Sequence, residues 1–115
     1  MNDLVRPAMY DAFHDILPVA EAAAGADRQS YDVVGPICET GDTFATARRL
    51  PATRPGNLIA FMTAGAYGST MSSSYNTRPL VAEVMVRGRD FAVVRPRQTY
   101  EDLIGQDRLP AWLAT

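Results

Sequence analysis

The stretch PLVAEVMVRGRDFAVVR, residues 79–95, decides the fold class that we predict for this chain. It holds two runs rich in β-branched residues, separated by the polar segment RGRD at residues 87–90. A glycine among polar residues between two such runs is typical of the turn of a β-hairpin. We therefore predict two strands, over residues 79–90 and 91–95, joined at this turn.

The rest of the chain favours the same strand-rich class. Downstream, Thr99 and Asp102 have the spacing of a capping box, which begins a short helix that Gly105 ends. Upstream, short apolar runs alternate with segments rich in glycine and proline. The expected fold is a single all-β domain over residues 1–115, a sandwich or barrel with short helices. We predict strands over 12–19, 31–34, 58–62 and part of 42–50, connections over 22–29 and 51–57, and a helical turn near Pro7.

Composition and charge exclude several classes of function. The net charge of −2 gives no reason to expect nucleic acid or an anionic membrane as a partner. No apolar run approaches the length of a membrane span, and the first residues lack the pattern of a signal peptide. The only cysteine, Cys38, cannot form an internal disulfide, so we expect a cytoplasmic protein. With His14 as the only histidine, soft ligands are too few for a zinc site, and we expect no metal.

The stretch GPICETGD, residues 35–42, places the only thiol next to a carboxyl group, and we call it the cysteine turn. A free cysteine is usually a small buried hydrophobe. In a polar turn, however, Cys38 can be exposed and can exchange a proton near neutral pH, because the usual pKa of a thiol is about 8.5. Taken by themselves, Glu39 and Asp42 have the ordinary interpretation of solvated turn residues, which is the usual case for acids. A Cys-His hydrolase is an alternative, although a lone histidine such as His14 is more often structural.

Two further groups of side chains suit binding. Residues 64–74, which we call the tyrosine loop, are small and polar, contain two glycines and carry Tyr67. Arg6 and Tyr10 lie four positions apart and share a face if their segment is helical. An arginine fork beside a phenol suits a carboxylate. An exposed arginine without a partner and ordinary half-buried tyrosines are the alternative.

Four motifs occur in one order along the chain: MNDLVRPAMYDAFHDILPV (residues 1–19), VGPICETGD (34–42), AGAYGSTMSSSYNTRP (64–79) and AEVMVRG (82–88). Together they resemble the C-terminal domain of the diaminopimelate decarboxylases, which are pyridoxal-phosphate-dependent enzymes of the alanine-racemase-like group. The resemblance covers nearly the whole chain. Ornithine and arginine decarboxylases share the cysteine turn and the Gly-Ala-Tyr segment, so they are the nearest alternative within the family.

The resemblance implies a function and a role for five residues. The function is decarboxylation of meso-2,6-diaminopimelate to L-lysine, the last step of lysine biosynthesis. Cys38 is expected to donate a proton after decarboxylation, in the active site of the partner subunit of a homodimer. Glu39 is expected to bind the distal ammonium group of this small-molecule substrate. Arg6 and Tyr10 are expected to bind its distal carboxylate, and Tyr67 both the substrate and the cofactor, pyridoxal 5'-phosphate.

The resemblance also implies a part that this sequence lacks. Enzymes of the family have an N-terminal α/β barrel that carries the lysine to which the cofactor is bound. None of the 115 residues is a lysine, so we expect the missing barrel to hold most of the cofactor site and the chain alone to be inactive. The sequence is then expected to be a fragment or the product of a start site placed too late. A non-catalytic β-barrel module for dimerisation or binding is the alternative outside the enzymes.

Overall fold

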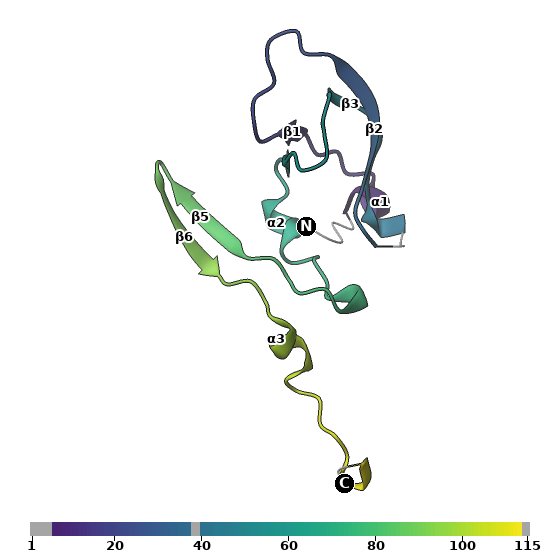
Figure 1. Cartoon of the computed structure of the whole chain (residues 1–115), viewed down its shortest axis with the longest axis vertical. Helices are drawn as coiled ribbons and strands as arrows, with labels where there is room; N and C mark the ends of the chain where they lie inside the picture. The colour runs from purple at the N-terminus through teal and green to yellow at the C-terminus, as the bar shows by residue number, and fades with distance from the viewer. Residues whose placement is uncertain (1–5, 38–39, 114–115) are drawn as a thin grey trace. The chain divides into compact units, whose positions relative to one another are not determined.

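The structure, a computed structural model, describes residues 6–37 and 40–113. The chain divides into two compact units, residues 1–72 (unit 1) and residues 73–115 (unit 2). The described strands pair in three two-stranded antiparallel sheets, and the helices are short (Figure 1). No helix in the described ranges is long and apolar enough to cross a membrane. The predicted strand-rich class with short helices is confirmed, whereas the assignment of residues 1–115 to one domain stays a prediction.

Unit 1 contains two of the sheets. One pairs β1 with β4, and the other pairs β2 with β3. Along the chain, helix α1 precedes these strands and helix α2 follows them (Figure 1). A 3-10 helix comes between β2 and β3 in the sequence. In chain order the elements are α1 (Arg6–Tyr10), β1 (Ile16–Pro18), β2 (Arg28–Val34), the 3-10 helix η1 (Thr40–Asp42), β3 (Thr43–Pro51), β4 (Ile59–Phe61) and α2 (Gly65–Gly68).

The sheet of β2 and β3 closes the cysteine turn at its base. Val34, the last residue of β2, pairs with Thr43, the first residue of β3. The register shifts around Asp32, whose side-chain Oδ1 accepts a hydrogen bond from the N–H of Ala47 at 2.8 Å. Ala47 has a φ of 48°, and an irregularity of this kind bends a strand. The turn is therefore attached to two paired strands.

A small hydrophobic core joins the two sheets of unit 1. Ile16 of β1, Val33 of β2, and Phe44 and Leu50 of β3 are buried together. The Phe61 ring packs on Phe44 with a centroid distance of 4.8 Å and an interplanar angle of 56°, a favourable tilted geometry. Val33 and Phe44 lie just outside the two ends of the cysteine turn, so the core anchors the strands that carry this turn.

His14 has the structural role that is usual for a lone histidine. It is buried, and its Nδ1 lies 3.1 Å from the backbone oxygen of Met62. A carbonyl oxygen only accepts, so Nδ1 carries the proton. The N–H of Met62 in turn donates to the oxygen of Asp15 at 2.8 Å. These two bonds extend the pairing of β1 and β4 by joining the residues beside them.

Unit 2 contains the hairpin predicted over residues 79–95. β5 and β6 pair around Gly88, whose φ of 61° meets the backbone requirement of a tight hairpin turn. In chain order the elements are the 3-10 helix η2 (Tyr75–Thr77), β5 (Glu83–Arg87), β6 (Asp90–Arg95), α3 (Tyr100–Ile104) and the 3-10 helix η3 (Ala111–Leu113).

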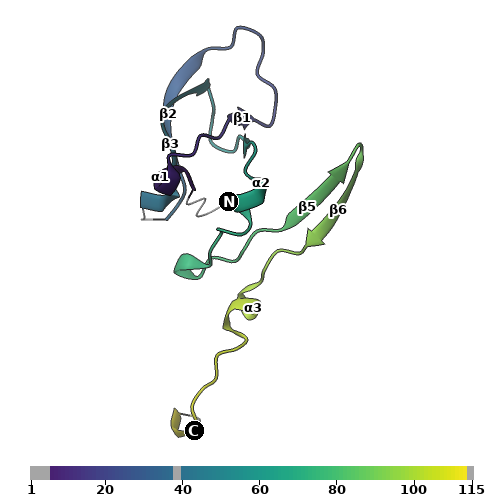
Figure 2. The same ribbon diagram turned by 180° about the vertical axis from the view of Figure 1, so that it is seen from behind.

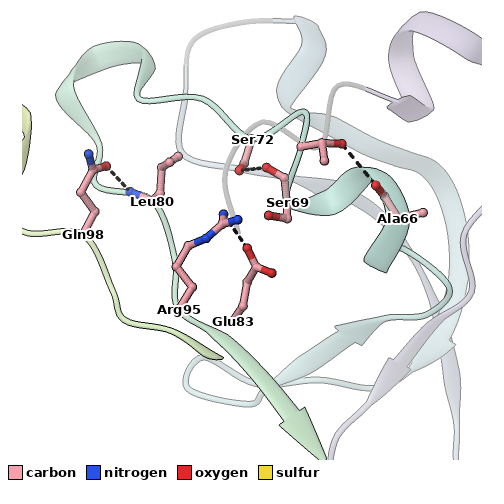
Figure 3. Close-up of polar contacts among 8 residues, drawn as sticks. Ala66, Ser69, Ser72, Leu80, Glu83, Arg95 and Gln98 are labelled. Carbon is pink, nitrogen blue, oxygen red and sulfur yellow. Dashed lines mark hydrogen bonds and ion pairs between the residues drawn. The ribbon is translucent and has the colours of Figure 1, made fainter. Parts of the chain in front are cut away.

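Polar contacts hold the open end of this hairpin (Figure 3). Arg95 forms an ion pair with Glu83 across the strands. Just beyond them, the N–H of Leu80 donates to Oε1 of Gln98 at 3.0 Å, and the N–H of Gln98 donates to the oxygen of Leu80 at 3.1 Å. The large apolar side chains between turn and open end are all more than half exposed. They are Val84, Met85, Val86, Phe91, Val93 and Val94.

The predicted capping box at the start of α3 is confirmed. Thr99 Oγ1 accepts from the N–H of Asp102 at 3.1 Å, and Asp102 Oδ2 accepts from the N–H of Thr99 at 2.8 Å. The backbone N–H and the hydroxyl of Thr99 together lower the pKa of the Asp102 carboxyl group, because both stabilise its charged form. The helix ends at Gly105, as predicted.

Several predicted boundaries are wrong. The strand predicted over 12–19 is reduced to β1, and the strand predicted over 79–90 is reduced to β5. The connection predicted over 22–29 ends earlier, because Arg28 pairs with Pro51 and extends the sheet of β2 and β3. The start of β2 is decided by pairing between residues 23 positions apart in the sequence. A local sequence pattern does not predict pairing over such a distance.

Candidate functional site

The cysteine turn is held by the carboxyl-terminal residue of its own sequence. The N–H of Gly35 donates to the backbone oxygen of Asp42 at 2.7 Å, and the N–H of Ile37 donates to Asp42 Oδ2, also at 2.7 Å. Cys38 and Glu39, the residues for which chemistry is predicted, fall outside the described residues. The structure thus describes the residues on both sides of them.

Asp42 corrects one expectation of the sequence analysis. We expected a solvated turn residue, but only 1% of the surface of Asp42 is exposed. Its carboxyl group is turned back onto the preceding segment, where the N–H of Ile37 is within hydrogen-bond distance. The sequence signal for this burial is Gly35, seven positions before Asp42, because a glycine leaves room for the carboxyl group to approach the backbone closely.

The helix that carries Arg6 and Tyr10 lies against the end of the cysteine turn. α1 is in contact with η1 and with β3 (Figure 2). Arg6 and Tyr10 are the first and last residues of α1, one helical turn apart, as predicted for a helical segment. Tyr10 is exposed. Two of the sequence stretches selected for binding, far apart along the chain, are therefore neighbours in unit 1.

An open hollow of about 420 Å³ lies between α1, η1 and β3. Arg48 of β3 is among its lining residues together with Phe13 and Thr40. The Arg48 guanidinium lies 4.2 Å from the centroid of the Phe13 ring and donates to the backbone oxygen of His14 at 2.9 Å. This cation–π contact and hydrogen bond fix the segment after α1 on the sheet, and they hold α1 close to the cysteine turn.

Tyr67 is carried by α2, within the tyrosine loop. Residues 64–74 were predicted as a loop, and within them Gly65–Gly68 form one helical turn, closed by a 2.6 Å hydrogen bond from the N–H of Gly68 to the oxygen of Ala64. Beyond it, Ser72 Oγ donates to the oxygen of Ser69 at 2.6 Å (Figure 3). A serine hydroxyl thus donates to a backbone oxygen where the chain leaves the helix. The side chain of Tyr67 itself is about half exposed.

The described residues contain no group of three or more histidine, cysteine, aspartate or glutamate side chains that could hold a metal ion. An exposed phenol, a helix with an arginine at its first position and a turn with a thiol and an acid in its sequence lie in one unit. Groups of these kinds can bind small polar molecules or exchange protons with them.

Comparison with known proteins identifies the family. The model of the pyridoxal-dependent decarboxylase C-terminal sheet domain matches residues 1–65, more than half of the chain. The chain belongs to this family. The match includes α1 and the cysteine turn, which carry Arg6, Tyr10, Cys38 and Glu39, and it ends two positions before Tyr67.

Relatives of this decarboxylase domain are longer proteins. Over 98% of its length the chain is 53% identical to diaminopimelate decarboxylase from Zymomonas mobilis, and over 97% it is 50% identical to that from Archaeoglobus fulgidus. In each case it covers 26% of the relative. The chain therefore spans about a quarter of the length of the curated relatives that it matches.

Solved structures give the same result for the sheet domain. A crystal structure of diaminopimelate decarboxylase from M. jannaschii matches 98% of the chain and 25% of its own length, with a TM-score of 0.86 at 34% identity. The enzyme from Helicobacter pylori, in complex with L-lysine, matches 91% of the chain and 25% of its own length, with a TM-score of 0.78 at 41% identity.

The residues of this domain suit contact with pyridoxal phosphate but not its covalent attachment. Covalent attachment of the cofactor aldehyde through a side chain needs a primary amine, and the sequence has no lysine. The half-exposed ring of Tyr67 can contact a bound ligand from one side.

Proposed function

We propose that this chain is the C-terminal part of an enzyme that decarboxylates meso-2,6-diaminopimelate to L-lysine, the last step of lysine biosynthesis. The observation that carries the proposal is the contact of α1 with η1, which brings the helix of Arg6 and Tyr10 beside the cysteine turn. The relatives called diaminopimelate decarboxylase, about 50% identical over nearly the whole chain, support this substrate.

The proposed substrate has two amino-acid heads, and the chain has residues for the distal one. Arg6 and Tyr10 bind the distal carboxylate, because a guanidinium fork and a phenol both donate hydrogen bonds to such a group. Glu39 binds the distal ammonium group by charge. Unpaired charges would remain with a substrate that lacks either group, so these residues also supply specificity.

Cys38 is the proposed proton donor, and Tyr67 contacts both substrate and cofactor. Pyridoxal phosphate, bound mainly by an N-terminal α/β barrel, supplies the electron sink for the loss of carbon dioxide. A proton must then reach one face of the α-carbon, and a thiol with a pKa near the working pH is a suitable acid. The carboxylate of Glu39 next in sequence favours the protonated thiol, since two negative charges repel each other.

The proposed assembly is a homodimer in which Cys38 acts in the active site of the partner subunit. A residue supplied in this way makes activity depend on dimer formation. The single cysteine supports a cytoplasmic location, where thiols stay reduced.

The function is tested in the full-length enzyme, by which we mean the protein in which this chain follows its barrel domain. With pyridoxal phosphate, we expect it to release carbon dioxide from meso-diaminopimelate and to leave lysine and ornithine nearly untouched. Both of these lack the distal carboxylate. Carbon dioxide release and lysine formation measured by mass spectrometry check the result. A preference for ornithine or arginine would assign the enzyme to another branch of the family, and no release from any substrate would favour the non-catalytic module.

The chain alone is expected not to hold pyridoxal phosphate covalently through a side chain, because it has no lysine. After incubation with the cofactor and borohydride, we expect no cofactor mass on any side chain in a peptide map. The full-length enzyme, treated in parallel, should carry that mass on one lysine. Label fixed to a side chain of the isolated chain would contradict the prediction.

A further inference from the structure

Asp42 is a buried acid that the proposed mechanism does not use. With 1% of its surface exposed, it is the largest fully buried side chain of the described residues. Its backbone oxygen accepts from the N–H of Gly35, and its side-chain Oδ2 accepts from the N–H of Ile37, both at 2.7 Å. Side chain and backbone of one residue therefore hold two positions of the segment that precedes Cys38.

The Asp42 carboxyl group occupies the space that a side chain at position 35 would need. A Cβ atom added to Gly35 would overlap both carboxyl oxygens and the carboxyl carbon of Asp42. Gly35 does not belong to the glycines of positive φ, so the backbone conformation does not explain the glycine. Close approach of the carboxyl group does, and the two residues form a matched pair.

From these contacts we infer that Asp42 is a positioning residue for Cys38, an inference that rests on the function proposed above. The chain is held at Ile37 by the Asp42 side chain, and it forms the 3-10 helix η1 from Thr40 to Asp42. Only two residues, Cys38 and Glu39, lie between these held positions. The Asp42 carboxyl group thus sets the backbone from which the proposed proton donor starts.

The expected effect follows from the geometry that proton transfer needs. A displacement of about 1 Å in a catalytic group can reduce the rate roughly 100-fold. Asp42→Ala removes the acceptor of the Ile37 N–H, and Gly35→Ala displaces the same carboxyl group by steric overlap. In the full-length enzyme we expect each change to lower kcat roughly 10- to 100-fold. Asp42→Asn keeps an oxygen acceptor and the shape, so it should recover most of the loss.

Asp32→Ala is the matched control. It removes another carboxyl group of unit 1 that accepts from a backbone N–H, here that of Ala47 at 2.8 Å. The control is expected to change kcat less than about twofold, because Asp32 holds the bulge of β2 and β3 and not the cysteine turn. Circular dichroism and thermal unfolding show which variants fold.

A double variant that combines Asp42→Ala with Cys38→Ala separates an effect on the position of the thiol from an effect on the stability of the enzyme. If Asp42 acts through the thiol, Asp42→Ala should lower kcat less than about twofold further in the Cys38→Ala enzyme, since the group it positions is already gone. A further drop as large as in the wild type would overturn the inference. So would a Gly35→Ala enzyme that folds and keeps wild-type kcat, which is the decisive variant if Asp42→Ala does not fold.

A second readout does not depend on the proposed reaction. The rate at which iodoacetamide alkylates Cys38, measured by peptide mapping, reports the surroundings of the thiol. We expect Asp42→Ala to change this rate at least about threefold and Asp32→Ala to leave it unchanged. Inactivity of the wild type toward meso-diaminopimelate, with the alkylation difference present, would reject the proposed function alone. Equal alkylation rates in the wild type and Asp42→Ala would reject the positioning role.

Discussion

Cys38→Ala in the full-length enzyme is expected to lower kcat by about 10²–10⁴-fold and to change the KM for meso-diaminopimelate only slightly. Positioned general acids typically contribute about this factor to a rate. The thiol is proposed to act after the substrate has bound, so its loss affects turnover first. Steady-state kinetics at saturating substrate, with substrate affinity measured separately, give the two quantities.

Thr40→Ser, two positions further along the same turn, is the control for this measurement. Thr40 is exposed, and the change removes one methyl group without touching the thiol. We expect it to keep wild-type turnover. Unchanged turnover in Cys38→Ala would contradict the role as proton donor, and it would return Cys38 to the ordinary interpretation of a small apolar residue.

Arg6→Ala should narrow the preference for meso-diaminopimelate by slowing that reaction. The distal carboxylate would lose its charged partner, and a buried polar group left without its hydrogen-bond partner costs about 1–3 kcal/mol. This corresponds to a decrease in kcat/KM of roughly 5- to 150-fold, since each 1.4 kcal/mol is a factor of ten. Lysine and ornithine lack that carboxylate, so their slow rates should stay the same. Competition between substrates in one mixture measures the preference directly.

Arg87→Ala provides the comparison for Arg6→Ala. Arg87 is almost fully exposed at the end of β5, and its guanidinium lies 3.8 Å from the Asp90 carboxylate. Exposed pairs of this kind contribute little, so neither rate nor preference should change. An Arg6→Ala enzyme with the wild-type preference would make Arg6 an ordinary surface residue, and another group would have to bind the distal carboxylate.

Local patterns predicted those parts of the fold that local forces determine. The hairpin around Gly88 and the capping box of Thr99 and Asp102 both form within a few residues, and both are present in the structure. The start of β2 was predicted wrongly, because the pairing of Arg28 with Pro51 depends on a distant strand. Contacts of that range leave no periodic signal in the sequence.

The candidate site was proposed mainly from the order of its motifs. Taken singly, an exposed arginine, a half-buried tyrosine and a lone cysteine each have an ordinary explanation, and only the resemblance to a family gave Arg6, Tyr10 and Cys38 roles. Asp42 was predicted wrongly as a solvated residue, because acids are exposed on average. The close approach to Gly35 that buries it is a property of the folded turn.

The hairpin of β5 and β6 has a consequence for the lifetime of this chain in a cell. Its valine, methionine and phenylalanine side chains are exposed to water, and among the described strands β5 and β6 pair only with each other, which leaves one edge of each strand unpaired. Chaperones and quality-control proteases recognise exposed apolar segments, and bare strand edges template self-association. If the chain is produced without a partner that covers this hairpin, chaperones would retain it or proteases would degrade it. The abundance of the chain in a cell would therefore report how completely the hairpin is covered.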